Sequence, residues 1–309
     1  MMTSTFSCPH GRIIGGKHVK CFDCPTGSTY DSTSVSCQCD NPDFIWDWNT
    51  VSCQANCQSG WTYDSTVGAC LPDDYVHNNC TNPVALMDRW SGCNSLAALE
   101  TACLLDPRDY QTYRVRKFAD GSCWMIDNLA YGGDYGVTDG CVANNGWGNF
   151  SGGGASSLAQ AQEEFVPGYY GHCRYNDWDG SYFYDWVAAL QNTHAWQGST
   201  DTLDINPQGI CPDGWRLGSQ DGSGDYESLY NTYGSGSFWT NSDYWNGDVS
   251  GCAQWSNGSI VNQWALGEYW SSTPNGNSAA VMLTLYSGGV NLYNSADRAN
   301  GLSVRCVKY

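Results

Sequence analysis

Residues 110–129 read Tyr-Gln-Thr-Tyr-Arg-Val-Arg-Lys-Phe-Ala-Asp-Gly-Ser-Cys-Trp-Met-Ile-Asp-Asn-Leu, and this stretch has the pattern of a β-hairpin. Apolar and polar residues alternate over residues 110–117, as they do in a half-buried strand. Asp120-Gly121 is a favoured hairpin turn, and residues 123–126 read as the returning strand. The C-terminal part of the chain is therefore predicted to contain an antiparallel sheet.

The segments around this hairpin predict helices and further short strands. Residues 95–103 read as a short helix that ends at the turn Asp106-Pro107, and helices are also predicted over residues 183–190 and 225–233. Beyond them, short strands are predicted over residues 269–272, 280–285, 289–293 and 302–308. Two early helices beside a compact twisted antiparallel sheet, joined by long irregular loops, indicate an α+β domain.

Five segments in this region resemble the motifs of the Fibrobacter succinogenes major paralogous domain family. Residues 120–129 are similar to its "DGxxWMxxNL" hairpin, and residues 182–190 resemble its "YxWxxA" helix. Gly-Ile-Cys-Pro-Asp-Gly-Trp-Arg-Leu at 209–217 is similar to "GxCPxGWRLP", and residues 269–273 and 303–308 match "YWSST" and "SVRCVK". The resemblance implies a C-type-lectin-like fold on a secreted or surface protein of bacteria or archaea.

The resemblance also makes specific statements about single residues. It implies a disulfide bond between Cys211 and Cys306, which would tie a central loop to the last strand. Gly218 stands where the family has a proline, and Tyr226 stands where a tryptophan is expected. Both departures preserve the local shape or loop, so we expect the fold to be retained. We place the lectin-like domain at residues 79–309.

Residues 1–78 form a different, cysteine-rich module. Three segments repeat, from Cys24 to Cys37, from Cys39 to Cys53 and from Cys57 to Cys70, each with an aromatic-Asp step before its closing cysteine. Repeats this short bury no core, so each must be stapled covalently. The aromatic-Asp step favours a tight turn inside a small two-stranded loop. The sequence leaves the cysteine pairing open, and a zinc or redox role for the Cys21–Cys24 pair stays as a minor alternative.

Composition indicates where the protein works. Seventeen cysteines are too many for a reducing compartment, so we expect an extracellular or cell-surface protein. Their odd number leaves at least one thiol unpaired or bonded between chains. The net charge of −18 disfavours nucleic acid and anionic membranes as partners. No stretch has the apolar length of a membrane span, and export predicts that a signal or anchor was removed ahead of Met1.

The segment 269–298 is the predicted contact face. Its Tyr, Asn, Ser and Gly residues are those of antibody-type binding surfaces, and they alternate with an apolar framework of Trp270, Val281, Leu283, Leu285, Val290, Leu292 and Val304. Period-two alternation would place the two sets on opposite faces. The predicted ligand-binding residues are Asn275, Asn277, Ser278, Tyr286, Ser287, Asn291, Tyr293, Asn294, Ser295, Asp297 and Arg298.

The resemblance further implies that this segment varies. Some similar proteins are targets of diversity-generating retroelements, which rewrite the end of the gene at adenines. We therefore expect a surface-displayed binding protein whose ligand is a protein or glycan on another cell, a virus or a surface. The alternative is a structural or adhesive subunit of an extracellular filament or sheath with fixed specificity. The same Tyr/Ser/Asn/Gly mix is also ordinary for loops and recurs at 231–258.

Catalysis and cofactors are not expected. Cys123, Cys141, Cys173 and Cys252 have no obvious reactive context that would activate a thiolate, and the five histidines show no ligand spacing. No catalytic or metal residue is therefore assigned, and the protein is expected not to be an enzyme. No cofactor is required. Structural calcium remains an alternative at the acidic loops 176–179 and 246–248, because carboxylate and amide oxygens bind that ion; a solvated turn is the competing interpretation.

Overall fold

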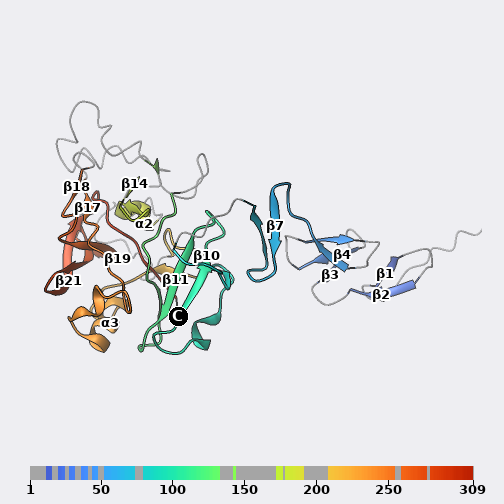
Figure 1. Ribbon diagram of the computed structural model, residues 1–309, viewed down its shortest axis with the longest axis horizontal. Coiled ribbons are helices and arrows are strands. Elements are labelled where there is room, and N and C mark those ends of the chain that lie inside the picture. The colour runs from blue at the N-terminus through green and yellow to red at the C-terminus, as the bar shows by residue number, and fades with distance from the viewer. Residues whose placement is uncertain are drawn as a thin grey trace, which may run out of the picture. The chain divides into compact units, whose positions relative to one another are not determined.

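The computed structural model describes residues 12–15, 20–24, 28–31, 36–40, 44–47, 52–73, 79–132, 142–143, 172–176, 178–190, 208–254, 259–276 and 279–308. The chain divides into two compact units, Met1–Tyr75 and Val76–Tyr309 (Figure 1). This boundary lies three residues before the predicted one between residues 78 and 79. Each unit is described by itself below.

The first unit consists, over its described residues, of two-stranded antiparallel hairpins. They are formed by β1 (Arg12–Gly15) with β2 (Lys20–Asp23), β3 (Ser28–Asp31) with β4 (Ser36–Cys39), β5 (Phe44–Asp47) with β6 (Ser52–Ala55), and β7 (Trp61–Asp64) with β8 (Ala69–Pro72). The last three hairpins correspond to the three sequence repeats. A small two-stranded loop in each repeat is therefore confirmed.

One register is shared by the three repeats. The aromatic residue of each aromatic-Asp step pairs with the closing cysteine, as Tyr63 does with Cys70. The disulfide bonds close each repeat on itself: Cys24–Cys37, Cys39–Cys53 and Cys57–Cys70. Cys24 is thus a disulfide partner and not half of a metal-binding or redox pair with Cys21. Bridges across such short loops replace the hydrophobic core that a hairpin of this size lacks.

The second unit contains a six-stranded sheet in the order β16-β22-β12-β11-β10-β9, of which Figure 1 labels β10 and β11. Its strands are β9 (Ala85–Leu86), β10 (Thr101–Leu105), β11 (Thr112–Lys117), β12 (Cys123–Met125), β16 (Arg216–Leu217) and β22 (Cys306–Lys308). All neighbours are antiparallel except β9 and β10, which are parallel. The predicted hairpin is present as β11 and β12.

The predicted helix over residues 95–103 is wrong. The structure has a short 3-10 helix, Gly92–Ser95, followed by the strand β10. The apolar residues of β10 are paired against β11, and two disulfide bonds, Cys80–Cys103 and Cys93–Cys123, hold this region to its neighbours. Sheet pairing and covalent links outweigh the weak helix propensity of the Leu/Ala/Glu run, because propensity amounts to only tenths of a kcal/mol per residue.

A second, three-stranded sheet carries the predicted contact face. It consists of β19 (Gly267–Asn275), β20 (Ala279–Tyr286) and β21 (Gly289–Asp297) in that order. Adjacent residues of β19 enter different cores: Trp270 joins one apolar cluster and Tyr269 the other. On β20, Met282 and Leu283 divide in the same way. Both faces of β19 and β20 are therefore covered over much of their length.

The remaining elements complete this unit. The α-helices are α2 (Trp186–Leu190) and α3 (Asp225–Tyr233), with a further 3-10 helix, Ser237–Trp239. Small sheets are formed by β13 (Val142–Ala143), β14 (His172–Tyr175) and β15 (Tyr182–Tyr184), and by β17 (Cys252–Ala253) with β18 (Ile260–Val261). The helix predicted over 225–233 has the predicted bounds, whereas the segment 183–190 begins as strand β15 and becomes helical at Trp186.

Cys211 and Cys306 are joined by a disulfide bond across 95 residues, and both residues are buried. Near this bond, the two departures from the family pattern meet around one side chain. Trp124 packs so closely on Gly218 that a Cβ there would lie 2.3 Å from its ring, and the Tyr226 ring lies 5.0 Å from the Trp124 ring. Glycine at 218 makes room for the tryptophan, so the two departures belong to one packing arrangement.

The described residues form mostly sheet with few helices and follow a disulfide-rich N-terminal region, an architecture compatible with α+β. Six disulfide bonds are formed among the described residues. None of the described helices combines the length and apolar character that a membrane crossing requires.

Candidate functional site

The described residues among those predicted to bind a ligand lie on the three strands β19, β20 and β21 or directly after β20 and β21. Asn275, Tyr286, Ser287, Asn291, Tyr293 and Ser295 are exposed, while Asn294 and Asp297 are half-buried. Asn277 and Ser278 lie outside the described residues. The exposed positions alternate with buried ones on β21, where Val290 and Leu292 face the core. On β20 the predicted alternation fails, because Met282 and Thr284 are buried together with Leu283 and Leu285.

Arg298 does not belong to this exposed set. Its side chain is 1% exposed and lies over the Trp186 ring, with 4.3 Å between the guanidinium carbon and the ring centroid. Its Nε donates a hydrogen bond to the Ala279 carbonyl at 3.0 Å, and an Nη donates to the Gly276 carbonyl at 2.8 Å. Arg298 thus binds a carbonyl on each side of the β19–β20 turn. Its prediction as an exposed contact residue is wrong because its side chain is buried.

A β-bulge sets the orientation of Tyr293. Met282 pairs with Asn294 and Thr284 pairs with Asn291, so that Leu292 and Tyr293 together oppose the single residue Leu283. Such a bulge adds one residue to a strand and re-aims its side chains. Leu292 remains in the core, whereas Tyr293 is 66% exposed. The bulge therefore presents a large aromatic side chain to solvent from a strand that is anchored on its other face.

Tyr293 borders a hollow of about 670 Å³ between the β20–β21 hairpin and α3. The hairpin contributes Tyr286, Val290, Asn291, Leu292 and Tyr293, and α3 with its preceding loop contributes Gly222, Glu227, Tyr230 and Asn231. We call these nine residues, together with Ser287 and Ser295, the contact face. Three tyrosines and two asparagines in one concave site combine flat apolar contact area with hydrogen-bonding groups, as binding surfaces do.

Glu227 is the acidic residue of this hollow. Its Oε1 accepts a hydrogen bond from the Gly222 backbone N–H at 3.0 Å, while no hydrogen bond among the described residues reaches its buried Oε2. The residue is 4% exposed. Glu227 and Tyr293 line the same hollow, and desolvation followed by the Glu227 carboxylate raises the pKa of Tyr293. The hollow therefore joins a tyrosine hydroxyl and a buried carboxylate.

The loop before α3 positions Glu227. Arg216 pairs with Asp225 in the first turn of the helix, and the same carboxylate accepts the Ser219 backbone N–H at 2.8 Å. Acidic residues in a first turn also suit the positive end of the helix dipole. Sequence analysis predicted this helix but did not assign Glu227 or Tyr230 to a site. No sequence signal was available, because the contact with β21 depends on tertiary packing.

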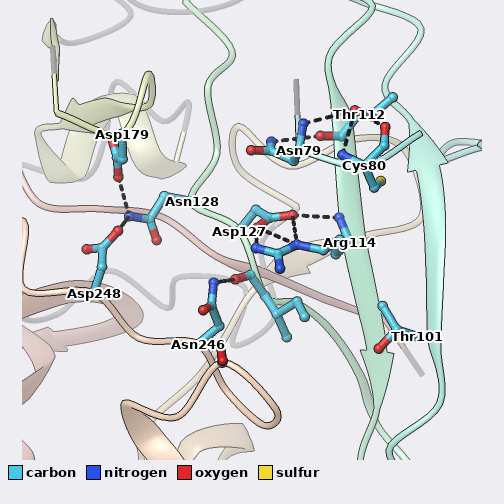
Figure 2. Close-up of polar contacts among 12 residues, drawn as sticks. Asn79, Cys80, Thr101, Thr112, Arg114, Asp127, Asn128, Asp179, Asn246 and Asp248 are labelled. Carbon is cyan, nitrogen blue, oxygen red and sulfur yellow. Dashed lines mark hydrogen bonds and ion pairs between the residues drawn. The ribbon is translucent and has the colours of Figure 1, made fainter. Parts of the chain in front are cut away.

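A second hollow of about 600 Å³ is lined by Asp179, Asn246 and Asp248 of the two acidic loops considered for calcium (Figure 2), and Asp177 lies outside the described residues. Asp179 and Asp248, from the two loops, both face Asn128, as Figure 2 shows. The Asn128 Nδ2 donates one hydrogen bond to each carboxylate, at 2.9 Å to Asp179 and 3.0 Å to Asp248. The structure thus brings together loops that the sequence could only treat one by one.

The Asn128 amide forms hydrogen bonds with both carboxylates and with Arg305. Arg305 is buried, and its Nε donates to the Asn128 Oδ1 at 3.0 Å, which orients the amide so that its NH₂ group lies between the carboxylates. Burial and then the Asp179 carboxylate raise the pKa of Asp248. A calcium ion between the two carboxylates would compete with an amide that already binds both. Among the described residues, no three His, Cys, Asp or Glu side chains converge as metal ligands.

A third hollow, of about 490 Å³, contains a free cysteine. Cys252 is buried and has no disulfide partner, so it accounts for one unpaired thiol of the odd count. Burial and then the neighbouring Glu268 carboxylate raise the pKa of Cys252 well above its usual range. A protonated, buried thiol is a poor nucleophile. The hollow also touches Ser295 and Asp297 of the predicted contact segment.

Comparison of the chain with known protein families, with curated proteins and with solved structures found no match in any of the three.

Proposed function

We propose that the protein is displayed outside the cytoplasm and binds a ligand through the contact face, without catalysing a reaction. The observation that carries this proposal is the hollow between α3 and the β20–β21 hairpin. There, Tyr286 and Tyr293 are 41% and 66% exposed although their chain neighbours Leu285 and Leu292 are buried. Large tyrosines on a fixed support lose little conformational entropy when they bind.

The cysteines support the location. The six disulfide bonds among the described residues, three of them in the small N-terminal hairpins, are stable in an oxidising compartment and are not retained in a reducing one. The ligand we propose is a protein or glycan on another cell, a virus or a surface. The C-type-lectin-like fold implied by the sequence motifs is part of this proposal, and so is diversification of the contact face by a retroelement.

Genetic variation provides the first experiment. The end of this gene is sequenced across sibling genomes together with the surrounding locus. We expect substitutions at exposed positions such as Tyr286, Asn291 and Tyr293, and a nearby reverse transcriptase with an adenine-rich template. We expect no such variation at Leu283 or at Arg298, because both are buried. An invariant contact face without that cassette contradicts diversification and favours a filament or sheath subunit of fixed specificity.

Binding itself is tested with matched variants. The purified full chain is applied to an array of defined glycans and to intact bacterial and archaeal cells, and retained protein is measured. Tyr286→Ala is compared with Tyr175→Ala, because both tyrosines are 41% exposed but Tyr175 lies outside the contact face. The proposal expects loss of binding only for Tyr286→Ala. Equal retention of the two variants and the unchanged chain contradicts a role of the contact face.

A further inference from the structure

The Glu227 carboxylate is the one charged group among the described residues of the contact face. One oxygen caps the loop before α3 through the Gly222 N–H, and the other is buried without a hydrogen-bond partner among the described residues. Burying an ionised carboxylate is costly unless a positive group or a hydrogen-bond donor compensates it. Gly222 supplies a single backbone donor and the Tyr293 hydroxyl interacts with the same carboxylate, but neither carries a positive charge. A cation in the hollow would supply that charge.

The surroundings of this carboxylate are aromatic. Tyr230, Tyr286 and Tyr293 line the same hollow, and Glu227 is the one charged side chain among its described lining residues. The faces of aromatic rings attract cations, and several rings around one carboxylate form the type of cage that binds quaternary ammonium and related groups. An anionic ligand would be repelled by Glu227, and a neutral apolar ligand would not compensate its negative charge.

We propose that the hollow between α3 and the β20–β21 hairpin binds an organic cation, an alkylammonium or guanidinium group, with Glu227 as counter-ion and the three tyrosines as its walls. This inference rests on the proposed binding function and names the ligand chemistry that the contact face recognises. The cation comes either from a free amine or from a lysine or arginine side chain of a protein ligand.

A purely structural role for Glu227 predicts a different outcome. In that role, the hydrogen bond to Gly222 would be the reason for the carboxylate, and glutamine would replace it without effect on any ligand. The glutamine variant retains an oxygen that accepts the Gly222 N–H but removes the negative charge. Glu227→Gln therefore tests the negative charge of residue 227 while keeping its hydrogen bond to the Gly222 N–H.

In the experiment, the full chain is titrated with defined probes and binding is measured by calorimetry. Choline is compared with 3,3-dimethylbutan-1-ol, which has the same shape without the charge, and Nα-acetyl-lysine methylamide and Nα-acetyl-arginine methylamide represent protein side chains. We expect saturable binding of at least one cation and at least about tenfold weaker binding of the neutral alcohol. Preference for choline points to a free amine, and preference for the amino-acid amides points to a protein ligand.

Variants locate the site. Glu227→Gln and Tyr293→Leu are each expected to weaken cation binding by about tenfold or more. Glu100→Gln removes the same charge at an exposed position outside the hollow, and Tyr175→Leu removes a ring outside it; both are expected to bind as the unchanged chain does. Thermal unfolding is recorded for each variant, and Tyr293→Leu, at an exposed position, tests the site even where Glu227→Gln unfolds.

The outcomes separate this inference from the proposed function. Absence of cation binding, or cation binding that Glu227→Gln and Tyr293→Leu leave unchanged, overturns the inference even where Tyr286→Ala abolishes binding to cells. Conversely, cation binding that depends on both residues supports the inference even where the glycan and cell assays fail, in which case the wider binding function is the part that is wrong.

Discussion

Among the disulfide bonds described in the second unit, removal of Cys211–Cys306 is expected to be the most destabilising. The bond closes a loop of 95 residues, whereas Cys93–Cys123 closes one of 30. In the chain-entropy model these loops correspond to about 4.7 and about 3.6 kcal/mol of stability, so the two bonds differ by about 1 kcal/mol. All four cysteines are buried, and the small cavities left by their replacement are therefore similar.

The assay compares two double variants of the full chain. Cys211→Ala with Cys306→Ala is measured against Cys93→Ala with Cys123→Ala by guanidinium unfolding, with tryptophan fluorescence as the signal. The free energy of unfolding is obtained from the midpoint and the slope, and an unchanged slope shows that the denatured state is comparable. We expect the first variant to lose more stability than the second. Trp124 and Trp215, both buried in the second unit, report on its packing.

The reasoning is refuted by a Cys211/Cys306 variant that loses less than about 2 kcal/mol or less than the Cys93/Cys123 variant. Either result would show that the native state relaxes when the bond is removed, or that residual structure in the denatured chain already restricts the long loop. In both cases loop entropy would not be the reason for the stabilisation, and the link between β22 and the loop before β16 would have to be explained by local packing.

Four further predictions concern single residues. Tyr293→Ala changes the unfolding free energy by no more than about 0.5 kcal/mol because the ring is mostly exposed; a larger loss in thermal unfolding argues for a packing role. Arg298→Ala costs about 3 kcal/mol or more, because it removes the donors of two carbonyls and the contact with a buried ring; a near-neutral result restores Arg298 as a surface residue. Burial and then the Asp106 carboxylate raise the pKa of Asp109 to about 8. The stabilisation of the folded state by protonated Asp109 is therefore present below about pH 4 and is lost as the pH rises through about 8. Asp109→Asn should remove this loss from a plot of the unfolding free energy against pH, and an unchanged plot assigns the loss to other groups. Cys252 should react with iodoacetamide only after unfolding, because its thiol is buried and protonated; rapid labelling of the folded chain, located by peptide mass spectrometry, contradicts this burial.

The elements that sequence analysis predicted correctly are those set by neighbouring residues. The N-terminal repeats close on themselves within 13 or 14 residues, so each aromatic-Asp step and its cysteines act inside one hairpin. The helix over residues 225–233, with acidic residues in its first turn and Gly234 after its end, and the hairpin of β11 and β12 likewise depend on signals within a few residues. The Cys211–Cys306 bond is long-range, and only the resemblance to a family pattern suggested it.

In other segments, packing between residues far apart in the chain produced a structure that differs from the one predicted by the local sequence pattern. Residues 101–105 have a composition that suits a helix, yet they pair with β11 and are linked to Cys80 by a disulfide bond. The alternation of β21 predicted an exposed and a buried face, and this pattern holds at Val290 and Leu292. On β20 it fails because a second apolar cluster covers the other face of the strand. The sequence alone does not show how many layers surround a strand.

The sequence by itself determined the cysteine framework, several local elements and a set of polar and aromatic residues for the contact face. Only the tertiary structure decided how those residues are used. It buried Arg298 against Trp186, turned Tyr293 outward at a bulge and made Glu227 line the same hollow as Tyr293. These outcomes depend on contacts between residues far apart in the chain, because the free energy of burial belongs to the packed arrangement and not to any one segment.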